Sequence, residues 1–71
     1  MTYGEKAVGL TFNPSGNQDV EEIKVAYAKI IDGLNKLRIG ASPEVQRMAS
    51  IAITEAQTAQ MWAVKAVTWK D

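Results

Sequence analysis

The sequence contains no cysteine and no histidine, and these two absences narrow what the protein can do. Without cysteine, neither a disulfide framework nor a thiolate metal site is available to stabilise a small chain. Without histidine as well, the usual pairs of catalytic base and nucleophile cannot form. A metal ion would need a cluster of carboxylates, and the sequence shows none. We therefore expect neither an enzyme nor a bound metal or cofactor.

The sequence also lacks a net charge and a long apolar run. Eight basic residues balance eight acidic ones, which argues against a surface that binds long DNA or RNA without specificity. No apolar stretch approaches the length of a membrane span, and the first residues do not follow the pattern of a signal peptide. We expect a cytoplasmic protein whose partners include neither a membrane nor a nucleic-acid polymer.

At 71 residues, the chain is expected to form one small domain with a limited core of its own. Residues 1–18 are predicted to be an arm, because glycines and a turn at Asn13-Pro14-Ser15-Gly16 interrupt them. Within this arm, only residues 8–12 have the composition of a short extended segment.

Residues 43–70 contain no glycine or proline after Pro43 and are predicted to form one long helix, with Ser42 as its N-terminal cap. Alanines recur in this stretch at alternating steps of three and four: Ala49, Ala52, Ala56, Ala59, Ala63 and Ala66. This spacing is typical of a helix that packs along a second helix over most of its length.

Residues 19–39 are predicted to form that second helix, capped by Asp19 in a capping box with Glu22, or alternatively by Asn17. Large side chains recur in it at the same steps: Val20, Ile23, Tyr27, Ile30, Leu34 and Leu37. Large residues facing alanines pack closely, so we predict an all-α protein. It should be an antiparallel two-helix hairpin with a turn at Gly40 and a short N-terminal arm.

Some large apolar side chains fall outside both rows, namely Ile31, Trp62 and Trp69. A single hairpin offers nothing to cover them, and exposed aromatic area of this kind is typical of an interface. We therefore predict that hairpins pack together as a homo-oligomer, whose number of subunits these residues do not give.

A binding function is favoured by basic and aromatic residues near the arm and the first helix. Lys24 lies one turn before Tyr27, and Tyr3, Phe12 and Asn13 are on the arm. Basic groups bind phosphates, rings stack on bases and amides contact base edges, which together suit a small anionic nucleotide. We expect Lys24 to face solvent. Phe12 either anchors the arm on the hairpin or stacks on a ligand.

Several segments carry a likeness to a known family: Leu10-Thr-Phe-Asn-Pro-Ser-Gly16, Val20-Glu-Glu-Ile-Lys24, Ile31-Asp32, Leu34-Asn35, Leu37-Arg38, Met48-Ala-Ser-Ile-Ala-Ile-Thr-Glu55 and Ala59-Gln-Met-Trp-Ala-Val-Lys-Ala66. Together they resemble the helical-hairpin domain of phage cyclic-nucleotide sponges, the anti-CBASS type-two and anti-Thoeris proteins. The most specific part of the likeness is the run Met-Trp-Ala-Val-Lys.

The resemblance implies a compact homohexamer that sequesters cyclic second messengers of anti-phage immunity in the cytoplasm of the host bacterium, without cleaving them. It implies a pocket between subunits for cyclic dinucleotides such as cGAMP, formed by Phe12, Asn13 and Lys24, with Tyr27 and Tyr3 as rival stacking residues. In some family members a separate site near a three-fold axis binds cyclic trinucleotides. The resemblance assigns Arg47 and Thr54 to that second site.

Two other functions remain open from the sequence. The hairpin is alternatively a structural interaction module, whose apolar rows and tryptophans serve only assembly or a protein partner. A DNA-binding accessory protein is the third hypothesis, and the balanced charge weakens it. A nucleotide absorbance retained by the purified protein would favour the sponge over both alternatives.

Overall fold

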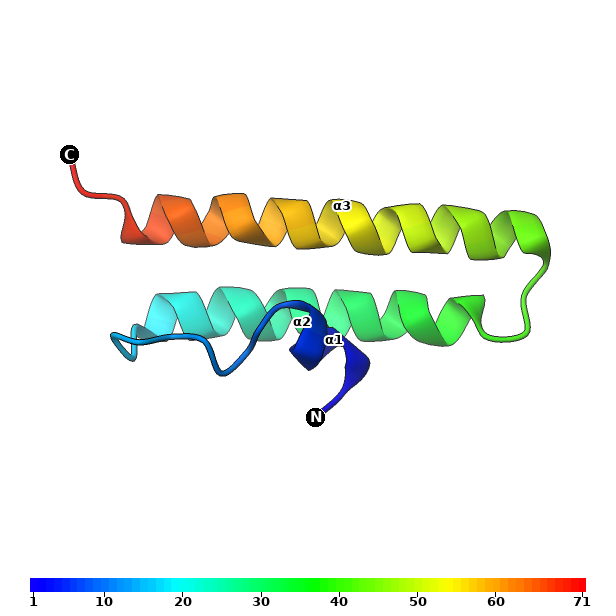
Figure 1. The fold of residues 1–71 in the computed structure, drawn as a ribbon, viewed down its shortest axis with the longest axis horizontal. Coiled ribbons are helices and arrows are strands. Elements are labelled where there is room, and N and C mark those ends of the chain that lie inside the picture. The colour runs from blue at the N-terminus through cyan, green and yellow to red at the C-terminus, as the bar shows by residue number, and fades with distance from the viewer.

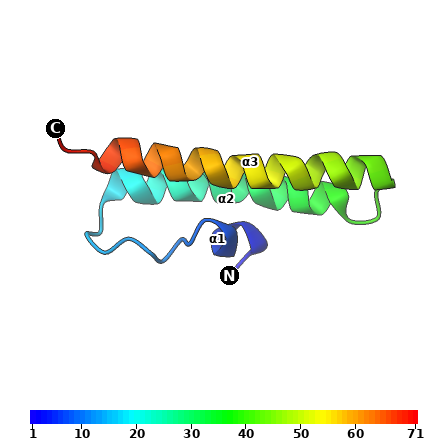
Figure 2. The ribbon, with the colours of Figure 1, turned by 45° about the horizontal axis from the view of Figure 1, so that its top comes forward.

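The computed structural model describes residues 1–71 and is all helical, with no strand. Helix α1 spans Tyr3–Ala7, α2 spans Gln18–Arg38 and α3 spans Pro43–Thr68. Helices α2 and α3 lie side by side and run in opposite directions, joined by the turn at residues 39–42 (Figure 1). Figure 1 and Figure 2 show α1 beside α2, and the end of α1 also reaches α3, where the Gln57 amide donates to the Ala7 carbonyl. The predicted all-α hairpin is confirmed, and a third, short helix is added to it.

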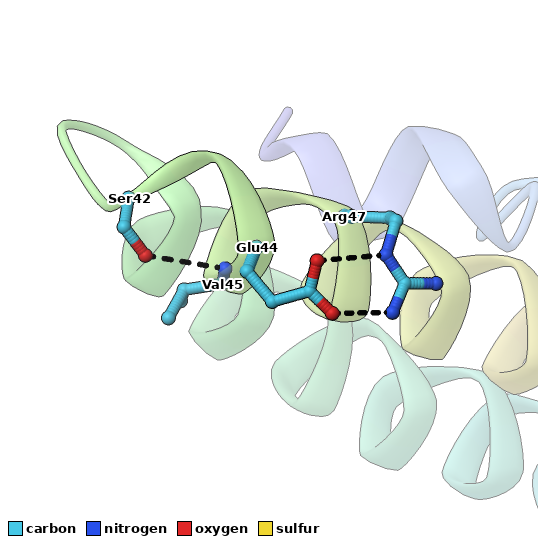
Figure 3. Close-up of polar contacts among 4 residues, drawn as sticks. All are labelled: Ser42, Glu44, Val45 and Arg47. Atoms are coloured by element: carbon cyan, nitrogen blue, oxygen red, sulfur yellow. Dashed lines mark hydrogen bonds and ion pairs between the residues drawn. The ribbon is translucent and has the colours of Figure 1, made fainter.

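Side-chain caps determine where the two long helices begin. The Asn17 side-chain oxygen accepts a hydrogen bond from the Val20 N–H at 3.1 Å, so the cap of α2 is Asn17 and not Asp19. The Ser42 hydroxyl accepts from the Val45 N–H at 3.4 Å, which makes Ser42 the cap of α3 (Figure 3). Helix α2 ends at Arg38 and α3 at Thr68, slightly before the predicted ends at residues 39 and 70.

The predicted arm is partly helical, because residues 2–5 hold a capping box that the sequence analysis missed. The Thr2 hydroxyl accepts from the Glu5 N–H at 3.1 Å, and the Glu5 carboxylate accepts from the Thr2 N–H at 2.8 Å. These reciprocal bonds satisfy amides that the first turn of a helix leaves free. Residues 8–11, expected to be extended, form turns instead.

Helix α1 packs on α2 because Gly4 has no side chain. A Cβ atom at Gly4 would lie 2.0 Å from the carbonyl oxygen of Ala28. The Gly4 N–H donates to the Asp32 carboxylate at 2.6 Å, which ties the start of α1 to the middle of α2. The two backbones therefore approach more closely than any other residue type at this position allows.

The core lies where the end of α1, α2 and α3 meet, and it consists of Val8, Ala28, Ile31 and Ile53. Ile31 is 0 % exposed and is the most deeply buried large side chain of the chain. The expectation that Ile31 remains uncovered is therefore wrong. Helix α1 and Val8 cover the side of α2 that a hairpin of two helices would leave open.

The predicted alanine row does not coincide with the buried face of α3. Ala49 is buried, and the other buried positions of α3 are Ile53 and Gln60, each one residue after a member of the row. Both predicted rows contain half-buried and exposed members; the exposed ones include Ala59, Ala66, Ile30 and Leu37. The contact face of α3 is therefore turned towards one flank of the predicted row.

The end of α3 carries an exposed aromatic surface. Trp62 and Trp69 are 65 % and 63 % exposed, and the Lys65 amine lies 5.1 and 5.7 Å from their ring centroids. The prediction that large apolar groups stay uncovered within one chain is confirmed for these tryptophans.

None of the three helices combines the length and the apolar character needed to cross a bilayer.

The close approach of α1 to α2 at Gly4 predicts how a substitution there changes the free energy of unfolding. Gly4→Ala should lower the free energy of unfolding by about 1–3 kcal/mol, because the added methyl group forces α1 away from α2. Gly33→Ala is the matched control: it lies within α2 with no atom near its added Cβ, and it should raise stability by up to ~1 kcal/mol. Urea unfolding of both variants measures the difference. Equal stability of the two variants would show that α1 does not dock as described.

Candidate functional site

A groove of about 550 Å³ runs between residues 6–12 and the second half of α3. It combines cationic, aromatic, amide and apolar side chains: Lys6, Phe12, Lys24, Gln57, Gln60 and Met61. A groove of this size fits the usual range for small-molecule sites, roughly 300–1,000 Å³. The groove lies on one chain, and its open side faces solvent in the single subunit.

Lys24 is at the base of the groove and is only 4 % exposed, so the expectation that it faces solvent is wrong. Its amine donates hydrogen bonds to the carbonyl oxygens of Gly9 and Phe12, at 2.8 and 2.6 Å. The chain's one ion pair is elsewhere, so no carboxylate neutralises this ammonium. An ammonium has three N–H donors, and two carbonyl bonds leave one donor and the positive charge to attract an anion.

Phe12 lies beside this amine at the edge of the groove. The residue is 74 % exposed, and its ring centroid is 5.5 Å from the Lys24 nitrogen. The first alternative considered from the sequence, an anchor that tucks the arm onto the hairpin, does not describe this exposed ring. The backbone of Phe12 is fixed through its carbonyl bond to Lys24, while the ring face stays open for stacking.

Two glutamines of α3 form the opposite wall of the groove, and the sequence analysis did not assign them. The Gln57 amide donates to the Ala7 carbonyl at 3.3 Å, whereas Gln60 is 5 % exposed. A signal for them was present: Gln60 is seven residues from Ile53 and from Val67, so it is a polar member of an otherwise apolar row. An isolated amide in such a row indicates a buried polar contact or a ligand.

The remaining candidates for the dinucleotide pocket lie outside the groove. Asn13 uses its amide to close a turn, donating to the Asn17 carbonyl at 2.9 Å and accepting from the Asn17 N–H at 3.2 Å. Tyr27 is half-buried and packs against the core. Tyr3 is 45 % exposed on α1, and its ring stacks under the Arg38 guanidinium at 5.2 Å.

Arg47 and Thr54, the predicted trinucleotide residues, do share a surface depression of about 390 Å³ on α3. Arg47 makes two hydrogen bonds to the Glu44 carboxylate, at 3.1 and 2.5 Å (Figure 3). This contact holds the pKa of Glu44 below its ordinary value and raises the pKa of Arg47. The Thr54 hydroxyl donates to the Ser50 carbonyl within its own helix. An anion at this site therefore competes with Glu44 for Arg47.

A wider depression of about 670 Å³ lies at the start of α2 and has a different electrostatic character. Glu21 and Glu22 line it, with Lys29 as its only basic residue. Adjacent carboxylates repel phosphates. The groove that contains Lys24 is therefore the better candidate for an anionic ligand.

Residues 5–68 match the family model described as Acb2/Tad1, hairpin domain. No curated protein and no solved structure gives a significant match to the chain. The family match confirms the resemblance to the anti-CBASS and anti-Thoeris sponge proteins. Since it spans nearly the whole chain, the protein belongs to the Acb2/Tad1 hairpin-domain family.

Proposed function

We propose that the protein is a sponge that binds cyclic oligonucleotide second messengers and thereby blocks anti-phage signalling in the host cytoplasm. The observation that carries the proposal is the Lys24 ammonium, buried without a carboxylate beside the exposed ring of Phe12. Membership of the sponge family supports the same function. Cyclic dinucleotides such as cGAMP are the ligands we assign to the groove.

The phosphate and the base of one nucleotide of such a ligand each have a partner in the groove. A phosphate meets the free donor of Lys24 in a charge-assisted hydrogen bond, which is stronger than a neutral one. A base stacks on the Phe12 ring, as bases do on exposed aromatic side chains. Lys6 adds a second positive charge at the rim. The groove has no carboxylate or imidazole to act as a general base, so we propose that the ligand is bound and released intact.

We further propose that the working form is a homohexamer. The groove is open on one side, and a neighbouring subunit would complete it around a ligand with two bases and two phosphates. Large exposed side chains on α2 and α3 support assembly: Ile30, Leu37, Ile51, Met61, Trp62 and Trp69. This exposed surface is also what favours the alternative function, a hairpin that serves only assembly or a protein partner.

Calorimetric titration with cyclic dinucleotides tests the proposed function. The wild-type protein should bind at least one of them, and the ligand recovered after heating should be chemically unchanged. Phe12→Ala should weaken binding roughly 5- to 150-fold, because base–aromatic stacking contributes about 1–3 kcal/mol per base. Tyr3→Ala removes an exposed ring outside the groove and should bind like the wild type.

Each outcome of this titration separates the hypotheses. Wild-type protein that binds no cyclic nucleotide would favour the assembly module over the sponge. Binding that depends on Tyr3 and not on Phe12 would place the ligand away from the groove. We choose Phe12 for this test because Lys24 also fixes the backbone of residues 9–12. If a Lys24 variant bound more weakly, the cause could be either the lost ligand contact or local unfolding of that segment.

The second site makes a separate prediction for cyclic trinucleotides. Arg47→Ala should weaken their binding roughly 10- to 100-fold, because a charged hydrogen bond contributes about 1.5–3 kcal/mol, and it should spare dinucleotides. Glu44→Gln removes the carboxylate that competes for Arg47, so this variant should bind trinucleotides more tightly than the wild type. Calorimetry against both ligand classes measures this, and equal losses of both ligands in Arg47→Ala would exclude two independent sites.

Light scattering tests the proposed assembly. At micromolar concentration the mass should be that of a hexamer of the 7.8 kDa chain. Trp62→Ala should shift the mass towards smaller species, because it removes an exposed aromatic group that a neighbouring subunit would bury. Lys29→Ala, an exposed position on α2, is the control and should leave the mass unchanged. A folded monomer of the wild type would contradict the proposal.

A further inference from the structure

Gln60 is the most unusual side chain of the groove, because it is polar, buried and without a partner in the chain. Its residue is 5 % exposed, on the face of α3 that otherwise buries Ala49 and Ile53. The neighbouring glutamine, Gln57, has its amide bonded to Ala7, but no hydrogen bond of the chain involves the Gln60 side chain. Every fully buried side-chain nitrogen or oxygen of the chain has a hydrogen-bond partner. Because the Gln60 amide has none, its atoms keep a small contact with solvent, at the surface where Gln60 lines the groove.

An amide in this position is costly for a fold that does not use it. The Gln60 amide keeps only a small contact with solvent, so it loses most of its hydration and gains no hydrogen bond within the chain in return. Methionine or leucine would suit the same place between apolar neighbours, since Met61 and Val64 also line the groove. The amide is therefore placed to bond with something that enters the groove.

We propose that Gln60 reads the Hoogsteen edge of a nucleobase, and that the base it selects there is adenine. This inference rests on the proposed function and adds a specificity-determining residue to the same groove. The Gln60 amide lies in a groove that also holds the Phe12 ring and the Lys24 ammonium, so one nucleotide places its base and its phosphate between them. A glutamine offers a donor and an acceptor side by side.

Adenine matches this pair on two of its edges. Its N6 amine donates to the glutamine oxygen while ring nitrogen N7 or N1 accepts from the glutamine nitrogen, which is the pairing through which amides recognise adenine. Guanine presents two acceptors, N7 and O6, on its Hoogsteen edge and leaves the glutamine oxygen without a donor there. The Gln60 amide therefore selects adenine over guanine when it contacts the Hoogsteen edge, since the donor and acceptor pairs of guanine, such as N1–H beside O6, lie on its other edges.

The test compares 3′,3′-cyclic di-AMP with its purine-riboside analogue, in which hydrogen replaces each N6 amine. Wild-type protein should bind cyclic di-AMP roughly 10- to 100-fold more tightly than the analogue, the range expected for one bidentate base contact. Gln60→Met keeps the shape of the side chain, so it should bind cyclic di-AMP as weakly as the analogue and lose the discrimination. Gln46→Met, at an exposed position of α3, should behave like the wild type.

A ligand-free measurement adds an independent readout. Without ligand and at the same protein concentration, Gln60→Met should melt a few degrees higher than the wild type, roughly 4–8 °C, because an unpaired amide with little access to solvent is gone. A lower melting temperature would show that the amide has a structural partner and would overturn the inference. A residue that matters only for packing would not give opposite changes in stability and affinity.

The outcomes separate this inference from the function on which it rests. Wild-type protein that binds no cyclic dinucleotide overturns both. Wild-type protein that binds cyclic di-AMP and its analogue equally, or Gln60→Met that retains the discrimination, overturns the role of Gln60 alone. The comparison of the two ligands on wild-type protein needs no variant, so the inference stays falsifiable even if Gln60→Met does not fold.

Discussion

The Lys24 ammonium lies inside the protein with no acidic partner, and the course of residues 9–12 follows from that charge. A buried ammonium must have hydrogen-bond acceptors, because losing its hydration is otherwise prohibitive. The carbonyl oxygens of Gly9 and Phe12 supply them. Gly9 adopts a φ of 61°, a conformation that glycine reaches without strain, and this lets the chain turn back over the lysine. The same turn carries the Phe12 ring to the edge of the groove.

The groove in turn depends on the docking of α1. Gly4 allows the α1 backbone to rest on the Ala28 carbonyl, and Val8 then enters the core against Ile31 and Ile53. Residues 6–12 are held in this way beside α3 and form one wall of the groove. We propose that the Lys24 ammonium serves both the fold and the ligand. Two of its N–H groups donate to the carbonyl oxygens of Gly9 and Phe12 and so fix residues 9–12, and the third N–H donates to the ligand. If the proposed function holds, anion binding and local order are linked at one atom.

Much of the architecture could be predicted from the sequence, because helix caps and apolar repeats are local signals. Ser42 and Pro43 gave the start of α3, and the alternating rows gave the hairpin. The rows did not give the contact face, because α2 packs against one flank of the alanine row, where Ile53 and Gln60 are buried. Ile31 and Lys24 are buried because residues 4–12 fold over α2. This contact joins positions that are far apart in the sequence, so a local sequence pattern does not predict it. Phe12 and Lys24 were predicted to share a site and do lie together, whereas the glutamines became visible only once the buried face of α3 was known.

The central claim is that a cyclic dinucleotide binds in the groove with its phosphate on the Lys24 amine. A crystal structure of the protein soaked or grown with cyclic di-AMP measures this directly. We expect a phosphate oxygen within hydrogen-bond distance of the Lys24 nitrogen, roughly 2.7–2.9 Å, with one base stacked on the Phe12 ring. Ligand bound elsewhere on the chain, with both groove residues untouched, would contradict it.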